Sequence, residues 1–109
     1  MSVRDAIVAE IELLASPSKQ LEYERNVPIA DVPSELICVF CNDLYHPKSE
    51  AFLSGFTADE VKDLAHLFGV LVEASKIKVL SVNELLKRRE WRTVVSVAKE
   101  LTTHYARSD

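Results

Sequence analysis

The sequence predicts an all-α protein, and three observations support that fold class. Only two glycines, Gly55 and Gly69, occur in the 109 residues, whereas tight hairpins usually need several. Two segments begin with Ser/Thr-x-x-Glu, the pattern of a helix capping box. Three stretches carry apolar residues at helical spacing. We expect a compact helical bundle or orthogonal array of four main helices plus one or two short ones, forming a single helical domain over residues 1–109.

The first main helix is expected from Ser2 to about Ala15, where apolar residues recur at helical spacing. Ser16-Pro17 ends it, because proline cannot continue the backbone hydrogen-bond ladder. The same pair can cap a short turn through Gln20-Leu21. From residue 22 to residue 32 the apolar residues lose any regular period. This segment is therefore predicted to be an extended, packed connection.

The second main helix is expected to begin at Asp31, whose side chain can cap it. It should end at Tyr45-His46, because the residue before Pro47 is pushed out of helical conformation. A short helical turn then starts at Ser49. Gly55 is interpreted as the residue that caps its end.

The longest helix is expected to begin at Thr57-Ala58-Asp59-Glu60, where the threonine hydroxyl and the glutamate carboxylate satisfy two backbone N–H groups. It runs to about Ser75, and residues 76–80 are interpreted as a linker because they alternate like a strand without a partner strand. Its apolar face is predicted to comprise Val61, Leu64, Ala65, Phe68, Leu71 and Val72.

The last part of the chain repeats the capping pattern at Ser81-Val82-Asn83-Glu84. Trp91 then begins an apolar stripe and is expected in the core. The pattern leaves open whether the helices at 82–89 and 90–106 are continuous. The other members of the stripe are Val94, Val95, Ala98, Leu101 and Tyr105.

Charge is distributed unevenly along the chain, although the net charge is only −4. Residues 1–75 hold 5 Lys/Arg against 13 Asp/Glu, a balance of −8, and residues 76–109 hold 8 against 4, a balance of +4. The basic segment can dock on the acidic body of the same chain. Alternatively, the two regions can face two kinds of partner.

We expect a cytoplasmic protein, and we expect no cofactor. Cys38 and Cys41 are too close in sequence for a bridge between them to restrict the unfolded chain much, so they are interpreted as reduced thiols. No apolar run approaches the roughly 18 residues of a membrane span. The N-terminal segment carries Asp5, Glu10 and Glu12, unlike a signal peptide. We expect neither export nor a membrane partner.

Cys38, Cys41 and His46 are three potential soft metal ligands within nine residues. Only His66 or His104 could supply a fourth ligand, and both are distant in sequence. A metal-binding or thiol enzyme built on these residues is one alternative. The structural interpretation is that the cysteines pack as small apolar residues and that His46 caps the end of its helix. We favour it, and assign no catalytic residue.

The segment Lys87-Arg88-Arg89 with Arg92 is the one local basic cluster. It could bind phosphates while Trp91 stacks on a base. The acidic pI of about 5.4 argues against a dedicated nucleic-acid-binding domain. Nucleic acid is therefore an alternative partner rather than the expected one.

The segment from Tyr45 to Phe56 contains aromatic residues and a histidine, types that are enriched where proteins meet. Phe52 and Phe56 are four residues apart, a spacing that more often points into a core. The residues that we consider candidates for binding a partner are Asp43, Tyr45, His46, Lys48, Glu50, Arg88, Arg89 and Arg92. The acidic residues that could meet a basic partner are Glu22, Glu24, Asp31, Asp43, Glu50, Asp59 and Asp63.

Four segments between Val27 and Lys99 resemble those of small, mostly uncharacterised bacterial all-helical proteins. They are Asn26-Val27-Pro28-Ile29, Asn42-Asp43-Leu44-Tyr45-His46-Pro47, Phe56-Thr57 and Glu90-Trp91. The resemblance implies a shape and carries over no catalytic residues. Small acidic bacterial proteins of this size include immunity proteins, which cover a toxin surface. The leading hypothesis is a non-catalytic protein-binding module of that type, with a homodimer left open.

Overall fold

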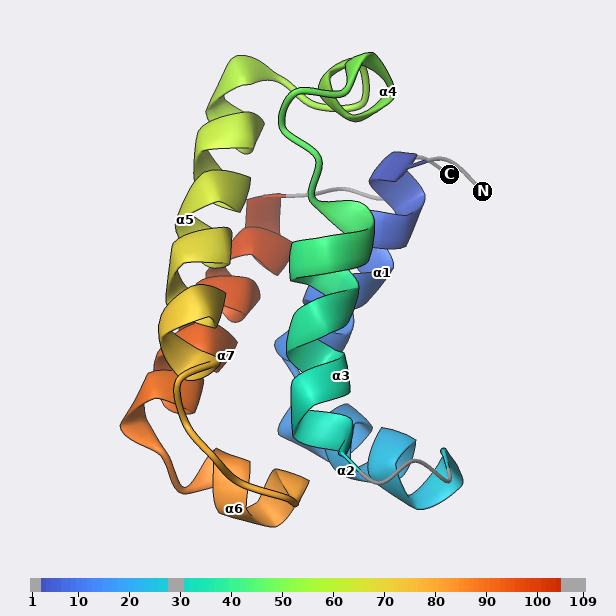
Figure 1. The fold of residues 1–109 in the computed structure, drawn as a ribbon. Coiled ribbons are helices and arrows are strands. Elements are labelled where there is room, and N and C mark those ends of the chain that lie inside the picture. The colour runs from blue at the N-terminus through green and yellow to red at the C-terminus, as the bar shows by residue number, and fades with distance from the viewer. Residues whose placement is uncertain (1–2, 28–30, 105–109) are drawn as a thin grey trace.

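The structure is a computed structural model that describes residues 3–27 and 31–104 (Figure 1), and it confirms the all-α fold. None of these residues lies in a strand. Tyr105, predicted to extend the last apolar stripe, and Ser2 lie outside the described residues. The elements are α1 (Val3–Leu14), α2 (Pro17–Asn26), α3 (Val32–Cys38), the π-helical η1 (Val39–Leu44), α4 (Glu50–Leu53), α5 (Ala58–Ala74), α6 (Val82–Leu86) and α7 (Arg89–His104).

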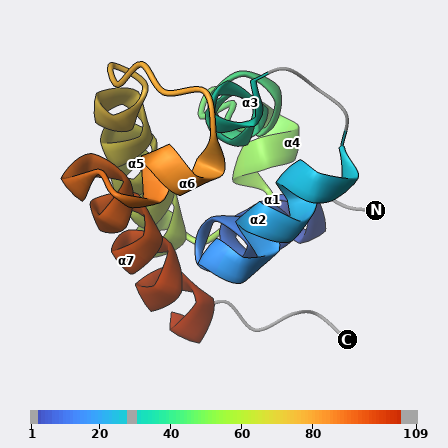
Figure 2. The ribbon, with the colours of Figure 1, turned by 90° about the horizontal axis from the view of Figure 1, so that it is seen from below.

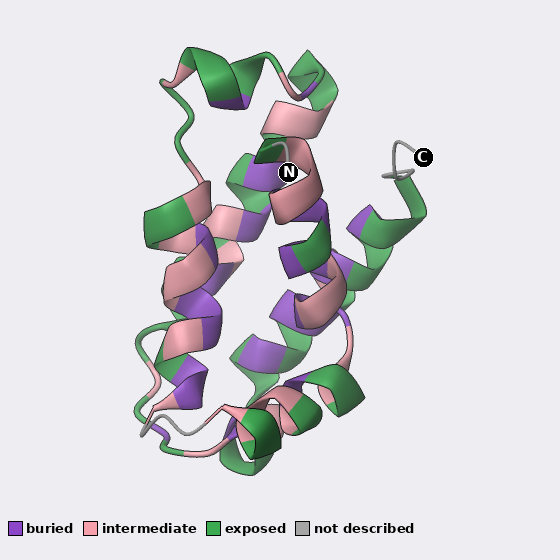
Figure 3. Cartoon of the chain, turned by 90° about the vertical axis from the view of Figure 1, so that its right-hand side faces the viewer, coloured by how far each residue is buried: buried purple, intermediate pink, exposed green. Residues whose placement is uncertain are grey.

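One hydrophobic core is surrounded by α1, by α3 with its continuation η1, by α5 and by α7. Figure 2 shows this arrangement from the end of the molecule. α7 packs against both α1 and α5, and η1, which continues α3, packs against the same two helices. Their buried residues face one another across the interior (Figure 3). α2 and α6 contact each other at one end of the molecule, and α4 lies at the opposite end (Figure 1).

α2 corrects the prediction of an extended segment after residue 22. Ser16 caps this helix by accepting a hydrogen bond from the Lys19 backbone N–H at 3.3 Å, and Pro17 occupies its first turn. The helix lacks an apolar stripe because the residue it buries is polar. Gln20 is fully buried and donates through Nε2 to the carbonyls of Leu13 and Leu14 at 3.1 and 2.9 Å. The side-chain amide therefore ties the corner between α1 and α2.

The second main helix ends where the sequence predicts, but its last turns widen into a π-helix. The Tyr45 backbone N–H donates to the Phe40 carbonyl at 2.8 Å, five residues back. Such i→i+5 turns are rare and usually occur as short insertions in α-helices. Here the wider turn brings the rings of Phe40 and Tyr45 into a stack with centroids 5.5 Å apart.

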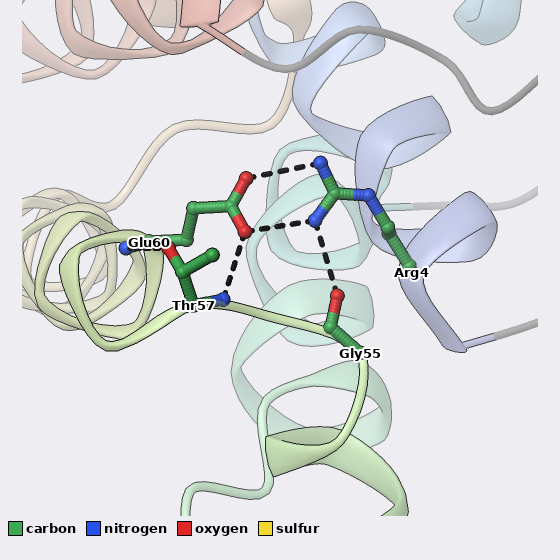
Figure 4. A network of polar contacts seen from close by, with 4 residues as sticks. All are labelled: Arg4, Gly55, Thr57 and Glu60. Carbon is green, nitrogen blue, oxygen red and sulfur yellow. Dashed lines mark hydrogen bonds and ion pairs between the residues drawn. The ribbon is translucent and has the colours of Figure 1, made fainter.

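The capping box at the start of α5 is confirmed, and Arg4 of α1 extends it (Figure 4). The Arg4 guanidinium donates to both oxygens of Glu60 at 2.9 Å and to the Gly55 carbonyl at 3.1 Å. Glu60 also accepts from the Thr57 backbone N–H at 2.9 Å. Hydrogen bonding to Arg4 is the main reason that the pKa of Glu60 is lowered. The network joins the α4–α5 turn to the N-terminal helix.

Gly55 does not cap α4 in the left-handed conformation that a glycine cap normally adopts. No glycine within residues 3–27 and 31–104 has a positive φ. Ser54 caps α4 in a right-handed helical conformation. A Cβ on Gly55 would meet only ordinary van der Waals neighbours, 3.5 Å or more away. The interpretation of Gly55 as the cap is therefore wrong.

The buried face of α5 is turned relative to the predicted face. Leu64, Leu67, Leu71 and Ala74 are buried, whereas Ala65 and Val72 are exposed. Apolar residues surround much of this helix, so its neighbours determine which of them are covered. Since α7 and η1 both pack against α5, the side between them becomes the buried one.

α6 and α7 are separate helices, because the helical conformation is interrupted between Leu86 and Arg89. Ser81 caps α6 by accepting from the Glu84 N–H at 3.2 Å. The reciprocal bond, from the Ser81 backbone N–H to the Glu84 carboxylate, is not formed among the described residues, and the Ser81 hydroxyl donates to Glu84 at 3.2 Å. The N–H of Val82, the first helical residue, donates to Glu24 of α2 at 2.9 Å. α7 then buries Trp91 completely, as predicted. The Trp91 Nε1–H donates to Gln20 Oε1 at 3.0 Å.

Candidate functional site

The predicted recognition loop lies beside α4, with Asp43, His46, Lys48 and Glu50 all exposed. The His46 ring Nε2 is 3.0 Å from the Asp43 carbonyl, which can only accept, so the imidazole N–H donates to the end of η1. This agrees with the expected capping role of His46. A pocket of about 220 Å³ adjoins the loop, with Asp43, His46 and Phe52 among its walls. The loop thus presents four polar side chains next to a small depression.

Tyr45 faces the interior more than the other loop candidates do. Its ring stacks on Phe40 and Phe68 with centroids 5.5 and 4.8 Å apart, and it meets the Phe52 ring edge-on at 5.5 Å. Burial raises the pKa of Tyr45. Phe52 and Phe56 are buried, as their spacing suggests. Tyr45 therefore links η1, α4 and α5, and it is only partly exposed.

The basic candidates lie at the other end of the molecule. Arg88, Arg89 and Arg92 are exposed at the break between α6 and α7, opposite α4 (Figure 1). The structure does not bring them together with the loop. It also contradicts the idea that Trp91 stacks on a base, because the indole is fully buried and bonded to Gln20.

The two cysteines are half-buried free thiols. Within residues 3–27 and 31–104, no group of three or more His, Cys, Asp and Glu side chains is placed to hold a metal ion. Burial raises the pKa of Cys41 from 9.0 to about 11, with smaller contributions from Cys38 and Glu10. Catalytic thiols have lowered pKa values, so the shift of Cys41 has the opposite direction.

Cys41 is therefore expected to react slowly with alkylating reagents. A pKa raised by two units reduces the thiolate fraction near neutral pH by about 100-fold. The measurement is the iodoacetamide reaction rate at pH 7.5 of the Cys38→Ser variant, in which Cys41 is the remaining thiol. The same variant unfolded in guanidinium is the control. Equal rates in the folded and unfolded states would contradict the expectation.

A site that the sequence analysis missed lies between α1, α2 and α3. Glu10, Tyr23 and Glu35, one from each helix, line a pocket of about 230 Å³. Leu13, Leu36 and Val39 complete its walls. Glu10 is 8% exposed, and its Oε1 is buried with no hydrogen-bond partner among the described residues. The pocket therefore combines two carboxyl groups and a phenol with an apolar lining.

Burial gives Glu10 an unusual protonation state. Its pKa is raised from 4.5 to about 8, first by removal from water and then by the Glu35 carboxylate. The pKa of Tyr23 is also raised, by burial and then by the charges of Glu35 and Glu10. A signal was present in the sequence, because Glu10 stands three residues after Ile7 and four before Leu14, within an apolar stripe.

No protein-family model, curated protein or solved structure matches the chain. Among the described residues, no helix is both long and apolar enough to cross a membrane.

Proposed function

We propose that the chain is a non-catalytic cytoplasmic protein-binding module, of immunity type, that places its acidic surface on a basic partner protein. The observation that carries the proposal is a set of exposed carboxylates that form no ion pair with any other described residue. Asp43, Glu50 and Asp59 are exposed and form no ion pair within residues 3–27 and 31–104. Asp43 lies near the end of η1, Glu50 in α4 and Asp59 in the first turn of α5, the parts of these elements that lie at the α4 end (Figure 1).

Within residues 76–104, the part of the basic segment that the structure describes, no side chain forms an ion pair with these carboxylates. The ion pairs among the described residues are Arg4–Glu60 and Lys76–Glu73. Arg88, Arg89 and Arg92 take part in neither, and they lie at the far end from α4. Exposed charge of one sign speeds the encounter with an oppositely charged protein and adds specificity. This arrangement supports binding to a basic surface better than docking of the basic segment on the α4 end.

The test is affinity capture from the native host with a charge-neutralised variant, Asp43→Asn/Glu50→Gln/Asp59→Asn. We expect the unmodified chain to retain a basic protein at low salt, and we expect the variant to retain at least about tenfold less, because electrostatic steering is removed. A matched variant, Glu73→Gln/Glu90→Gln/Glu100→Gln, changes the net charge equally at exposed positions on α5 and α7. It should retain the partner.

Two outcomes would overturn the proposal. One is recovery of the chain alone at both low and moderate salt. The other is equal capture by both triple variants, which would mean that the carboxylates of the α4 end are not recognised. A salt-sensitive partner lost with the first variant and kept with the second would support the proposal.

A further inference from the structure

The pocket between α1, α2 and α3 contains a buried carboxyl group, one oxygen of which has no hydrogen-bond partner in the part of the chain that the structure describes. Buried polar groups in proteins almost always have a hydrogen-bond partner, and an exception calls for an explanation. Glu10 is more than nine-tenths buried, yet its Oε1 has no partner among the described residues. The pocket of about 230 Å³ that it lines is large enough for a side-chain-sized group.

A second carboxyl group in the same pocket indicates that a ligand bound beside Glu10 would carry positive charge. Glu35 lines the pocket from α3 and adds negative charge beside Glu10. Burial and the charge of Glu35 keep Glu10 protonated near neutral pH, and a cation between the two groups favours the ionised form of Glu10 and removes the repulsion. Tyr23, from α2, adds an aromatic ring, which attracts cations over its face.

The apolar walls indicate what kind of cation fits. Calcium takes 6–8 oxygen ligands and magnesium keeps several waters, whereas half of this lining is Leu13, Leu36 and Val39. A primary ammonium group on an aliphatic stem matches both the carboxyl groups and the apolar side chains of the lining. Its N–H groups can donate to the carboxylates while the methylene groups contact the leucine and valine side chains.

We propose that the pocket lined by Glu10, Tyr23 and Glu35 binds a primary alkylammonium group. The group can come from a lysine side chain of a partner protein or from a free aliphatic amine. The lysine source rests on the proposed protein-binding function, whereas binding of a free amine does not. Glu10 and Glu35 accept the ammonium hydrogen bonds, and the apolar walls hold the stem.

The experiment is a titration of the ¹⁵N-labelled chain followed by NMR at pH 7.5 and constant ionic strength. The probes are n-butylammonium chloride, Nα-acetyl-lysine N-methylamide and the neutral isostere 1-butanol. We expect saturable shifts at the Glu10, Tyr23 and Glu35 amides with a cationic probe and none with the alcohol. Binding by both cations shows that the pocket admits a lysine side chain, and binding by butylammonium alone excludes the lysine source.

Variants show whether the carboxylates carry the binding. Glu10→Gln and Glu35→Gln should each weaken it by about tenfold or more, because Glu35→Gln removes a charged hydrogen-bond acceptor and Glu10→Gln removes one that becomes charged when the bound cation displaces its proton. Glu100→Gln, at an exposed position on α7, is the matched control and should bind normally. Equal shifts with 1-butanol, no saturable binding of either cation, or unchanged affinity in both pocket variants would each overturn the site. Recovery of the chain alone in the capture experiment, with amine binding intact, would overturn only the proposed function.

Discussion

Replacing Trp91 with alanine is expected to lower the free energy of unfolding by about 3–5 kcal/mol, the range for removing a large buried aromatic side chain. Trp91 is fully buried on α7, where it contributes to the core shared with α1 and α5. Its indole N–H donates to Gln20 Oε1 at 3.0 Å, and Gln20 in turn holds the carbonyls of Leu13 and Leu14. The substitution therefore opens a cavity and also leaves a buried amide oxygen unpaired. Chemical denaturation followed by circular dichroism measures the loss.

Two further variants separate the causes of this loss. Trp91→Phe keeps much of the ring but removes the N–H, so it should cost about 1–3 kcal/mol, the penalty of an unpaired buried acceptor. Leu80→Ala removes a large apolar side chain that is 73% exposed and should change stability by less than about 0.5 kcal/mol. A loss for Trp91→Ala no larger than that for Leu80→Ala would contradict the assigned role of the indole.

The sequence was sufficient to predict those helices whose apolar residues and caps agree. Thr57 and Glu60 form the predicted capping box of α5, and the stripe of α7 is buried as expected from Trp91 to Leu101. In both helices, local hydrogen bonding and burial favour the same residues. When the two agree, a helix can be predicted from the sequence before the helices that pack against it are known.

The features that were missed depend on contacts between distant segments. α2 buries Gln20, a polar residue whose partners are Trp91 and the end of α1, so no apolar period marks this helix. The buried side of α5 is decided by where α7 and η1 lie, and the spacing of apolar residues does not indicate the π turn at Tyr45. These features follow from tertiary packing, which overrides local preference.

The candidate site was predicted in part. Asp43, His46, Lys48 and Glu50 are exposed beside α4, but the arginine cluster is at the opposite end and Tyr45 packs inward. The acidic pocket combines residues from three helices, so spacing along the chain cannot show it. Glu10 was nevertheless visible as an acid within the apolar stripe of the first helix.

Glu10→Gln is expected to stabilise the protein at neutral pH and to flatten the dependence of stability on pH. The folded state holds the Glu10 proton up to a pKa of about 8, whereas the ordinary value is 4.5. Between these values the unfolded state gains by ionising, so stability is fully present below pH 4.5 and is lost as the pH rises through 8. At about 1.4 kcal/mol per unit, the loss reaches about 3 kcal/mol at pH 7 and about 5 kcal/mol above pH 8.

Glutamine keeps the shape of the protonated acid without this loss, so the variant should exceed the unmodified protein by about 3 kcal/mol at pH 7 and by less than about 1 kcal/mol at pH 5. Denaturation at both pH values measures the difference. Glu35, Tyr23 and Cys41 are the titratable groups coupled to Glu10, and all three remain in the variant. The exposed control Glu100→Gln should change stability little at either pH. If Glu10→Gln gave the same small change at pH 5 and pH 7, Glu10 would have to be ionised in the folded protein at neutral pH, because only a proton retained on folding produces the predicted slope.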